Sequence, residues 1–132
     1  MKKVIASPLV PAAVGPYSQA IENDGLLITS GQLGINKETG KIPEDLEEEI
    51  RQVFYNLRAV LVEAGYDFED VMKTTVFLTD LGNFQLLNRI YAEYFTSAYP
   101  ARSCYQVGAL PAGARVEIEA IARKCGGCAQ LW

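Results

Sequence analysis

The chain has 132 residues, of which 49% are hydrophobic and 21% are charged, and its formal net charge is −4. The length fits a single domain, and the hydrophobic content excludes a disordered chain. The net negative charge is unlike that of a nucleic-acid-binding protein. No apolar run is long enough to cross a bilayer, and the N-terminus lacks the apolar segment of a secretory signal. We therefore expect no nucleic-acid partner, no membrane span and a cytoplasmic location.

The sequence contains no histidine. This excludes catalysis by a Ser–His or Cys–His pair and excludes a histidine-ligated metal site. Acid–base chemistry in this protein must therefore come from Asp, Glu, Tyr, Lys, Cys or water.

The three cysteines are Cys104, Cys125 and Cys128. The last two form a C-x-x-C motif, which supplies two of the four ligands of a structural zinc site and is followed by too few residues for a thioredoxin-type helix. We interpret residues 125–132 as a flexible tail behind a domain of residues 1–124, with a metal or redox role as the alternative. Cys104 lies within a predicted strand, where a small core residue is more common than a reactive thiol.

The first part of the chain predicts a β-hairpin. Residues 17–22 and 26–30 read as strands, and Asn23-Asp24-Gly25 between them tolerates the positive φ of a tight turn. The two ends of an antiparallel hairpin lie side by side. Tyr17 is therefore expected near Ser30-Gly31.

Two amphipathic helices follow, separated by a strand. Apolar residues recur at helical spacing over residues 43–64, and Gly65 is a candidate C-cap. Residues 71–79 predict a strand, and residues 84–95 predict the second helix. Asn88 lies off the apolar stripe of that helix, which by itself predicts a solvent-facing residue.

Residues 100–107 and 116–122 read as strands joined by a loop rich in Gly and Pro, and we predict that they pair as an antiparallel hairpin. Side chains alternate between the faces of a strand. Arg102 on the first strand could then meet Glu117 or Glu119 on the second.

This arrangement leaves two interpretations of Arg102 open. In one, Arg102 forms an exposed cross-strand ion pair worth about 0.5 kcal/mol. In the other, its planar guanidinium binds the carboxylate of a ligand, and a glutamate acts on the atom next to that carboxylate.

Residues 3–6 predict a short edge strand at the start of the chain. The full order of elements predicts one α+β domain with a mixed β-sheet and two helices packed on one face. Two helices leave the other face bare, and self-association would cover it. Apolar residues are expected on that bare face: Ile28, Val76, Leu78 and Ile121.

Three stretches of sequence resemble one family. They are Gly15-Pro16-Tyr17-Ser18-Gln19-Ala20, Thr29-Ser30-Gly31-Gln32, and Pro100-Ala101-Arg102-Ser103-Cys104 followed by Val116-Glu117-Ile118-Glu119-Ala120-Ile121-Ala122. The sequence resembles the YjgF/Rid family, and within it the reactive-intermediate deaminase branch, from about Lys3 to Ala122.

The resemblance implies a chorismate-mutase-like fold and a homotrimer, in which the sheets form a central barrel with a ligand cleft at each subunit interface. It also implies hydrolysis of 2-imino acids to 2-keto acids and ammonia, with no cofactor and no metal. The implied substrates are 2-iminobutanoate, 2-iminopropanoate and 2-aminoacrylate, the enamine tautomer of 2-iminopropanoate.

By match to the family, Arg102 binds the substrate carboxylate and Glu117 positions water. The remaining matched pocket residues are Tyr17, Ser30, Gly31, Asn88 and Cys104. Two alternatives stay open: a non-catalytic trimer that binds small carboxylates or regulates, as the translation-inhibitor and ribonuclease labels of some members suggest, and a chorismate mutase by fold analogy alone. A pure binder needs Arg102 but not Glu117.

Overall fold

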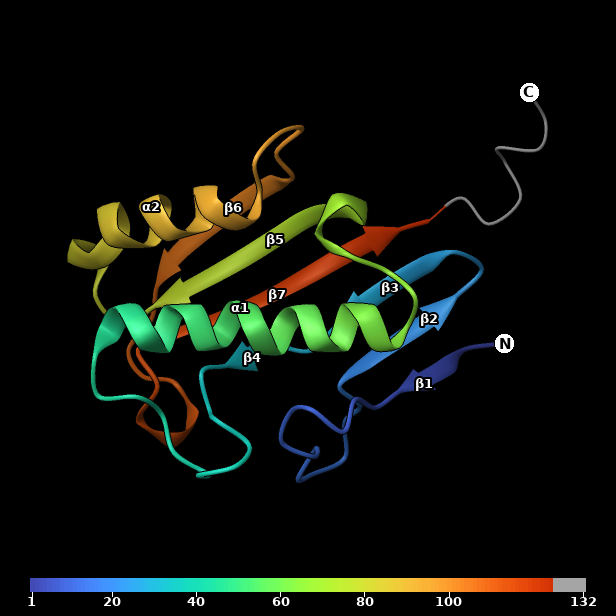
Figure 1. Ribbon diagram of the computed structural model, residues 1–132, viewed down its shortest axis with the longest axis horizontal. Helices are drawn as coiled ribbons and strands as arrows, with labels where there is room; N and C mark the ends of the chain where they lie inside the picture. The colour runs from blue at the N-terminus through green and yellow to red at the C-terminus, as the bar shows by residue number, and fades with distance from the viewer. Residues whose placement is uncertain (125–132) are drawn as a thin grey trace.

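The computed structural model describes residues 1–124, so the Cys125 and Cys128 motif lies outside the described residues. Strands form one mixed sheet in the order β1-β2-β3-β7-β5-β6, and β4 continues the β3 edge along β7 (Figure 1). The strands are β1 (Lys3–Ile5), β2 (Ala20–Asn23), β3 (Leu26–Thr29), β4 (Gln32–Leu33), β5 (Val71–Leu78), β6 (Ala101–Gln106) and β7 (Val116–Arg123). The β5–β6 pair is parallel, and the other neighbours are antiparallel.

Two helices, α1 (Leu46–Glu63) and α2 (Phe84–Tyr94), lie on the same face of this sheet (Figure 1). The prediction of an α+β domain with two helices on one face is therefore confirmed. Helix α1 begins three residues later than the sequence pattern indicated, because Asp45 is the N-cap and accepts a hydrogen bond from the Glu48 N–H at 3.1 Å. Gly65 ends the helix as predicted, with a φ of 86°.

The core lies between the helices and the sheet. Helix α1 contributes Ile50, Val53, Phe54 and Leu57, all fully buried. Phe54 is also the centre of an aromatic cluster that reaches α2, where it stacks on Tyr94 with ring centroids 4.5 Å apart. No helix of residues 1–124 is both long and apolar enough to cross a membrane.

The predicted N-terminal hairpin is confirmed. Strands β2 and β3 pair antiparallel, and Asp24 and Gly25 both have positive φ, as a two-residue type I′ turn requires. The first strand begins at Ala20 rather than Tyr17, because the preceding residues form an irregular loop. The chain still returns as expected, since the Ser30 N–H donates to the Gln19 carbonyl at 2.9 Å.

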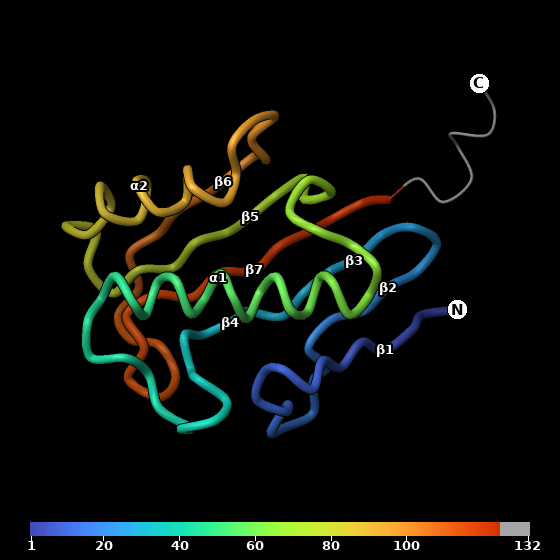
Figure 2. Tube along the Cα trace, viewed as in Figure 1, coloured from blue at the N-terminus to red at the C-terminus, as the bar shows by residue number. Residues whose placement is uncertain are grey.

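The predicted hairpin of β6 and β7 is wrong. Strand β5 lies between them: it pairs parallel with β6 and antiparallel with β7, as the path of the chain shows (Figure 2). A parallel pair requires a crossover, and α2 supplies it. The connection at 107–115 is also longer than typical hairpin loops, so it can carry the chain past the end of β5.

Two of the four apolar residues expected on the bare face of the sheet lie there. Val76 and Leu78 are buried on the helix side, where they alternate along β5 in phase with the buried Thr74. Ile28 and Ile121 are register partners and do lie on the bare face, 49% and 39% exposed. An apolar row on this face therefore has no cover within residues 1–124.

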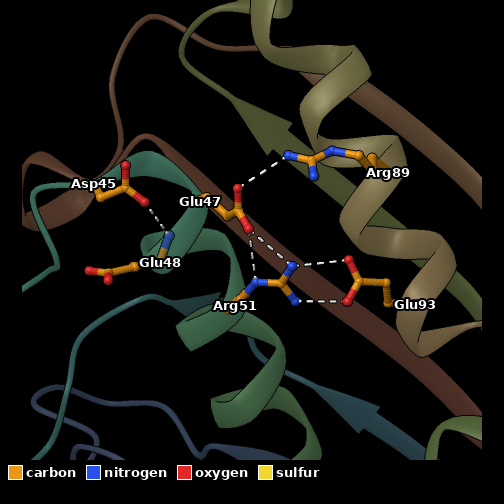
Figure 3. A network of polar contacts seen from close by, with 6 residues as sticks. All are labelled: Asp45, Glu47, Glu48, Arg51, Arg89 and Glu93. Carbon is orange, nitrogen blue, oxygen red and sulfur yellow. Dashed lines mark hydrogen bonds and ion pairs between the residues drawn. The ribbon is translucent and has the colours of Figure 1, made fainter.

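Charged residues on α1 and α2 join the two helices. Arg51 forms a two-point ion pair with Glu93 of α2, with both N–O distances 3.0 Å (Figure 3). Glu47 accepts from Arg51 of its own helix and from Arg89 of α2. Arg51 holds the pKa of both glutamates below the ordinary value. The network fixes α2 against α1 at the surface.

A second ion pair has a buried carboxylate. The Glu49 carboxylate, fully buried in α1, accepts from the Arg115 side chain at 2.6 Å and from the Arg115 backbone N–H at 2.8 Å. Arg115 also donates to the carbonyls of Pro43 and Glu44. Its position just before β7 ties the start of this strand to α1.

Candidate functional site

Arg102, the second residue of β6, projects toward α2. Its guanidinium carbon lies 4.8 Å from the ring centroid of Tyr91 and 5.3 Å from that of Phe84. It lines a pocket of about 400 Å³ together with Asn88, Tyr91, Ala92, Tyr99 and Pro100. Within residues 1–124 it forms no ion pair. The exposed cross-strand ion pair, one of the two interpretations of Arg102, is therefore absent from the described chain.

Asn88 and Cys104 belong to the same side of the sheet as Arg102. The Asn88 Oδ1 is buried and has no hydrogen-bond partner among residues 1–124, which contradicts the solvent-facing position that helix periodicity predicts. A buried amide oxygen without a partner is an acceptor available to a ligand. Cys104 is half-buried, and this burial raises the pKa of its thiol despite the nearby Arg102 charge. The thiol is therefore better suited to a neutral packing role than to action as a thiolate nucleophile.

A second group of predicted residues gathers around Glu117 of β7. A Cβ on Gly31 would lie only 2.6 Å from the Glu117 Cδ, so any other residue at position 31 would displace the Glu117 side chain. The Ser30 hydroxyl donates to the Ser18 carbonyl at 2.6 Å and fixes the loop beside them. Tyr17, 53% exposed, and Gly31 line a pocket of about 420 Å³. The predicted proximity of Tyr17 and Gly31 is thus confirmed.

These two groups do not meet within one chain. Arg102 pairs with Thr74, which pairs with Ala120, and both partners are buried under the helices. Glu117 lies three residues before Ala120 on β7, so it projects from the opposite, bare face. The expected meeting of Arg102 with Glu117 across a hairpin is therefore wrong, because β5 separates their strands and the sheet separates their side chains.

The Glu117 carboxylate is half-buried and forms no ion pair with any of residues 1–124. Burial raises the pKa of Glu117 above its ordinary value of 4.5, and repulsion from Glu119, on the same face, adds to the rise. A glutamate whose pKa moves toward neutrality is better suited to take up and return a proton. Within residues 1–124, no three or more Cys, Asp or Glu side chains are placed to hold a metal ion.

This shift predicts a pH-dependent effect on stability. The folded state holds the Glu117 proton more tightly than the unfolded chain does. The free energy of unfolding therefore falls as the pH rises from 4.5, the ordinary pKa of glutamate, to the higher pKa of Glu117 in the folded state. We expect Glu117→Gln to match or slightly exceed the wild-type free energy of unfolding at pH 7. The gain should vanish below pH 4.5, and urea titrations across this range measure it. A variant less stable than wild type at pH 7 would contradict the burial argument.

Sequence reasoning missed three residues around Arg102. They are Phe84 and Tyr91 of α2 and Thr74 of β5, whose hydroxyl lies 2.8 Å from the Tyr91 hydroxyl. The spacing of Phe84 and Tyr91, two helical turns apart, could have indicated that both rings face the same neighbour. Nothing in the sequence indicated that this neighbour is Arg102, because β6 was paired with the wrong strand.

The matches to known proteins agree with the fold. Residues 8–124 match the model of the family described as endoribonuclease L-PSP. The chain belongs to this family, which is the YjgF/Rid family that its motifs resemble.

Curated relatives in this family are named as deaminases. The 2-iminobutanoate/2-iminopropanoate deaminase of Mus musculus is 49% identical over 92% of this chain and 91% of its own. The protein of the same name from Escherichia coli K12 is 43% identical over 92% of this chain and 98% of its own.

Solved structures match the same fold. A Rid family protein of unknown function from Yersinia pestis has a TM-score of 0.91 and 48% identity, covering 94% of this chain and all of its own. TdcF of E. coli, solved with bound serine, has a TM-score of 0.89 and 40% identity, covering 92% and 98%.

Proposed function

We propose that this protein is a deaminase that hydrolyses 2-imino acids, namely 2-iminobutanoate and 2-iminopropanoate with its tautomer 2-aminoacrylate, to 2-keto acids and ammonia. The observation that carries the proposal is Arg102, a guanidinium held in a pocket with no carboxylate partner among residues 1–124. The names of the curated relatives support the reaction. The serine bound to TdcF of E. coli is a small molecule with the same α-carboxylate.

The chemistry needs little beyond positioning and proton transfer. The imine carbon is electrophilic, so water can add to it without a covalent intermediate on the protein. Arg102 would fix the carboxylate by two parallel hydrogen bonds and so place the imine carbon. Glu117 would take a proton from the attacking water and return it to the nitrogen, which gives a carbinolamine. It would then carry the hydroxyl proton of this carbinolamine to the amine, so that the carbonyl forms as the carbon–nitrogen bond breaks and ammonia leaves. The Asn88 Oδ1 offers an acceptor for the N–H of the substrate.

Arg102 and Glu117 act together in this mechanism only if they come from different protomers. We therefore place each site between two chains of a homotrimer, with Arg102, Asn88 and Cys104 from one and Tyr17, Ser30, Gly31 and Glu117 from its neighbour. The uncovered apolar row of the sheet supports this assembly, because a chorismate-mutase-like trimer would bury it in a central barrel. A cytoplasmic location and the absence of a nucleic-acid partner complete the proposal.

Ammonia release from freshly generated 2-aminoacrylate, measured with and without the protein, tests the proposed reaction directly. Acceleration by catalytic amounts of protein is the expected result. Binding of pyruvate without any acceleration would instead support the alternative of a non-catalytic carboxylate-binding module.

Complementation between two inactive variants tests the shared site. Arg102→Ala and Glu117→Gln each damage one half of every site. When equal amounts of the two chains are refolded together at random, a site between neighbours is intact when one chain supplies Arg102 and the next supplies Glu117. About one quarter of the sites meet this condition, so we expect about a quarter of the wild-type ammonia release. Each variant refolded alone is the control.

The assembly is measured on the same samples by light scattering. If the mixed trimers form and remain inactive, both residues of each site come from the same chain and the interfacial site is wrong. A stable monomer at micromolar concentration would remove the trimer itself.

A further inference from the structure

Two aromatic rings of α2 face the guanidinium of Arg102. Phe84 is the first residue of the helix, and Tyr91 lies two turns later on the same side. The Arg102 guanidinium carbon lies over both rings, 5.3 Å from the Phe84 centroid and 4.8 Å from the Tyr91 centroid. Both distances fall within the range of cation–π attraction.

Neighbouring side chains hold the Tyr91 ring in place. Its hydroxyl is buried and lies 2.8 Å from that of Thr74, the register partner of Arg102 on β5. Its ring also packs at 4.7 Å on Phe95 and edge-on against Phe54 at 5.9 Å. Burial raises the pKa of the Tyr91 hydroxyl, so the group stays protonated and its bond to Thr74 persists through the neutral range.

This geometry constrains the guanidinium and leaves its edge unoccupied. Cation–π contacts engage the flat face of a guanidinium, whereas its N–H donors point outward in the plane of the group. No ion pair within residues 1–124 occupies that edge of Arg102. The other described arginine with a nearby ring, Arg58 over Phe68, has its edge taken by Asp67.

We propose that Phe84 and Tyr91 are positioning residues for the deaminase: their rings hold Arg102 in one orientation, with its donor edge turned to the pocket for the substrate carboxylate. This inference rests on the proposed function, in which Arg102 binds that carboxylate. Ordering a long side chain before binding removes part of the entropy cost that binding would otherwise incur.

Phe84→Leu removes one ring and keeps an apolar side chain. We expect it to weaken pyruvate binding, measured by calorimetry, by about twofold to thirtyfold, the range of a partly desolvated cation–π contact. Phe84→Tyr restores a ring and should bind pyruvate as the wild type does. Phe68→Leu is the matched control, because it removes a ring that packs on Phe54 and lies beside Arg58 rather than Arg102.

A spectroscopic signature separates positioning from packing. Protons held over aromatic rings are shifted by the ring current, so the Arg102 Nε–H resonance, assigned by its loss in Arg102→Lys, should move in Phe84→Leu and stay in Phe68→Leu. Unchanged pyruvate affinity and an unchanged resonance in Phe84→Leu would overturn the inference. A wild-type protein that neither binds pyruvate nor releases ammonia would instead overturn the proposed function, and the role of the rings with it.

Discussion

Arg102→Ala is expected to abolish deamination while the chain stays folded and assembled. The side chain is half-buried beside a pocket and takes part in no ion pair within residues 1–124, so its removal leaves no buried charge unpaired. What is lost is the two-point contact with the substrate carboxylate. Arg102→Lys should also be severely impaired, by about 2–4 kcal/mol in transition-state binding. The ammonium of lysine cannot form the two parallel hydrogen bonds that a planar guanidinium makes to a carboxylate.

Glu117→Gln separates binding from chemistry. We expect this variant to lose ammonia release while it keeps its affinity for pyruvate, because Glu117 acts on water rather than on the carboxylate. Arg102→Ala should lose both properties. Calorimetry with pyruvate and ammonia release from 2-aminoacrylate measure the two properties independently. Near-normal turnover by Arg102→Ala would refute the substrate role of this residue.

Arg115→Ala is expected to produce a large loss of stability. It would leave the Glu49 carboxylate, which is fully buried, without its cation, and would remove the donors to the Pro43 and Glu44 carbonyls. Removing one partner of a buried ion pair costs roughly 3–5 kcal/mol of the free energy of unfolding, and we expect the lower end of this range because the Arg115 side chain is partly exposed. Urea denaturation at fixed protein concentration measures the loss, because assembly couples stability to concentration.

Arg58→Ala is the matched control for this prediction. Arg58 makes a comparable two-point contact with Asp67, at N–O distances of 3.1 and 3.0 Å, but more than half of its side chain is exposed. An exposed pair contributes about 0–1 kcal/mol. If Arg115→Ala loses no more stability than Arg58→Ala, then the buried carboxylate of Glu49 finds other compensation and the argument fails.

The local elements of this fold follow from local sequence. Hydrophobic periodicity located both helices, and Gly65 ends the first because a residue with positive φ closes it. Asp24 and Gly25 specify the N-terminal turn for the same steric reason. Arg102, Glu117 and the other candidate site residues also came from the sequence, through the resemblance of short motifs to a known family.

The pairing of strands and the grouping of the site residues depended on the tertiary structure. Strand β7 could pair with β6 or with β5, and its own pattern suits either partner. The choice is set by α2, which carries the chain across to a parallel β6, and by the burial of β7 at the centre of the sheet. This pairing places Arg102 under α2, beside Tyr91 and Phe84, and leaves Glu117 on the bare face. Alternation along a strand shows which side chains share a face of the sheet. Which of the two faces is covered by helices becomes known only when the neighbouring strands are known.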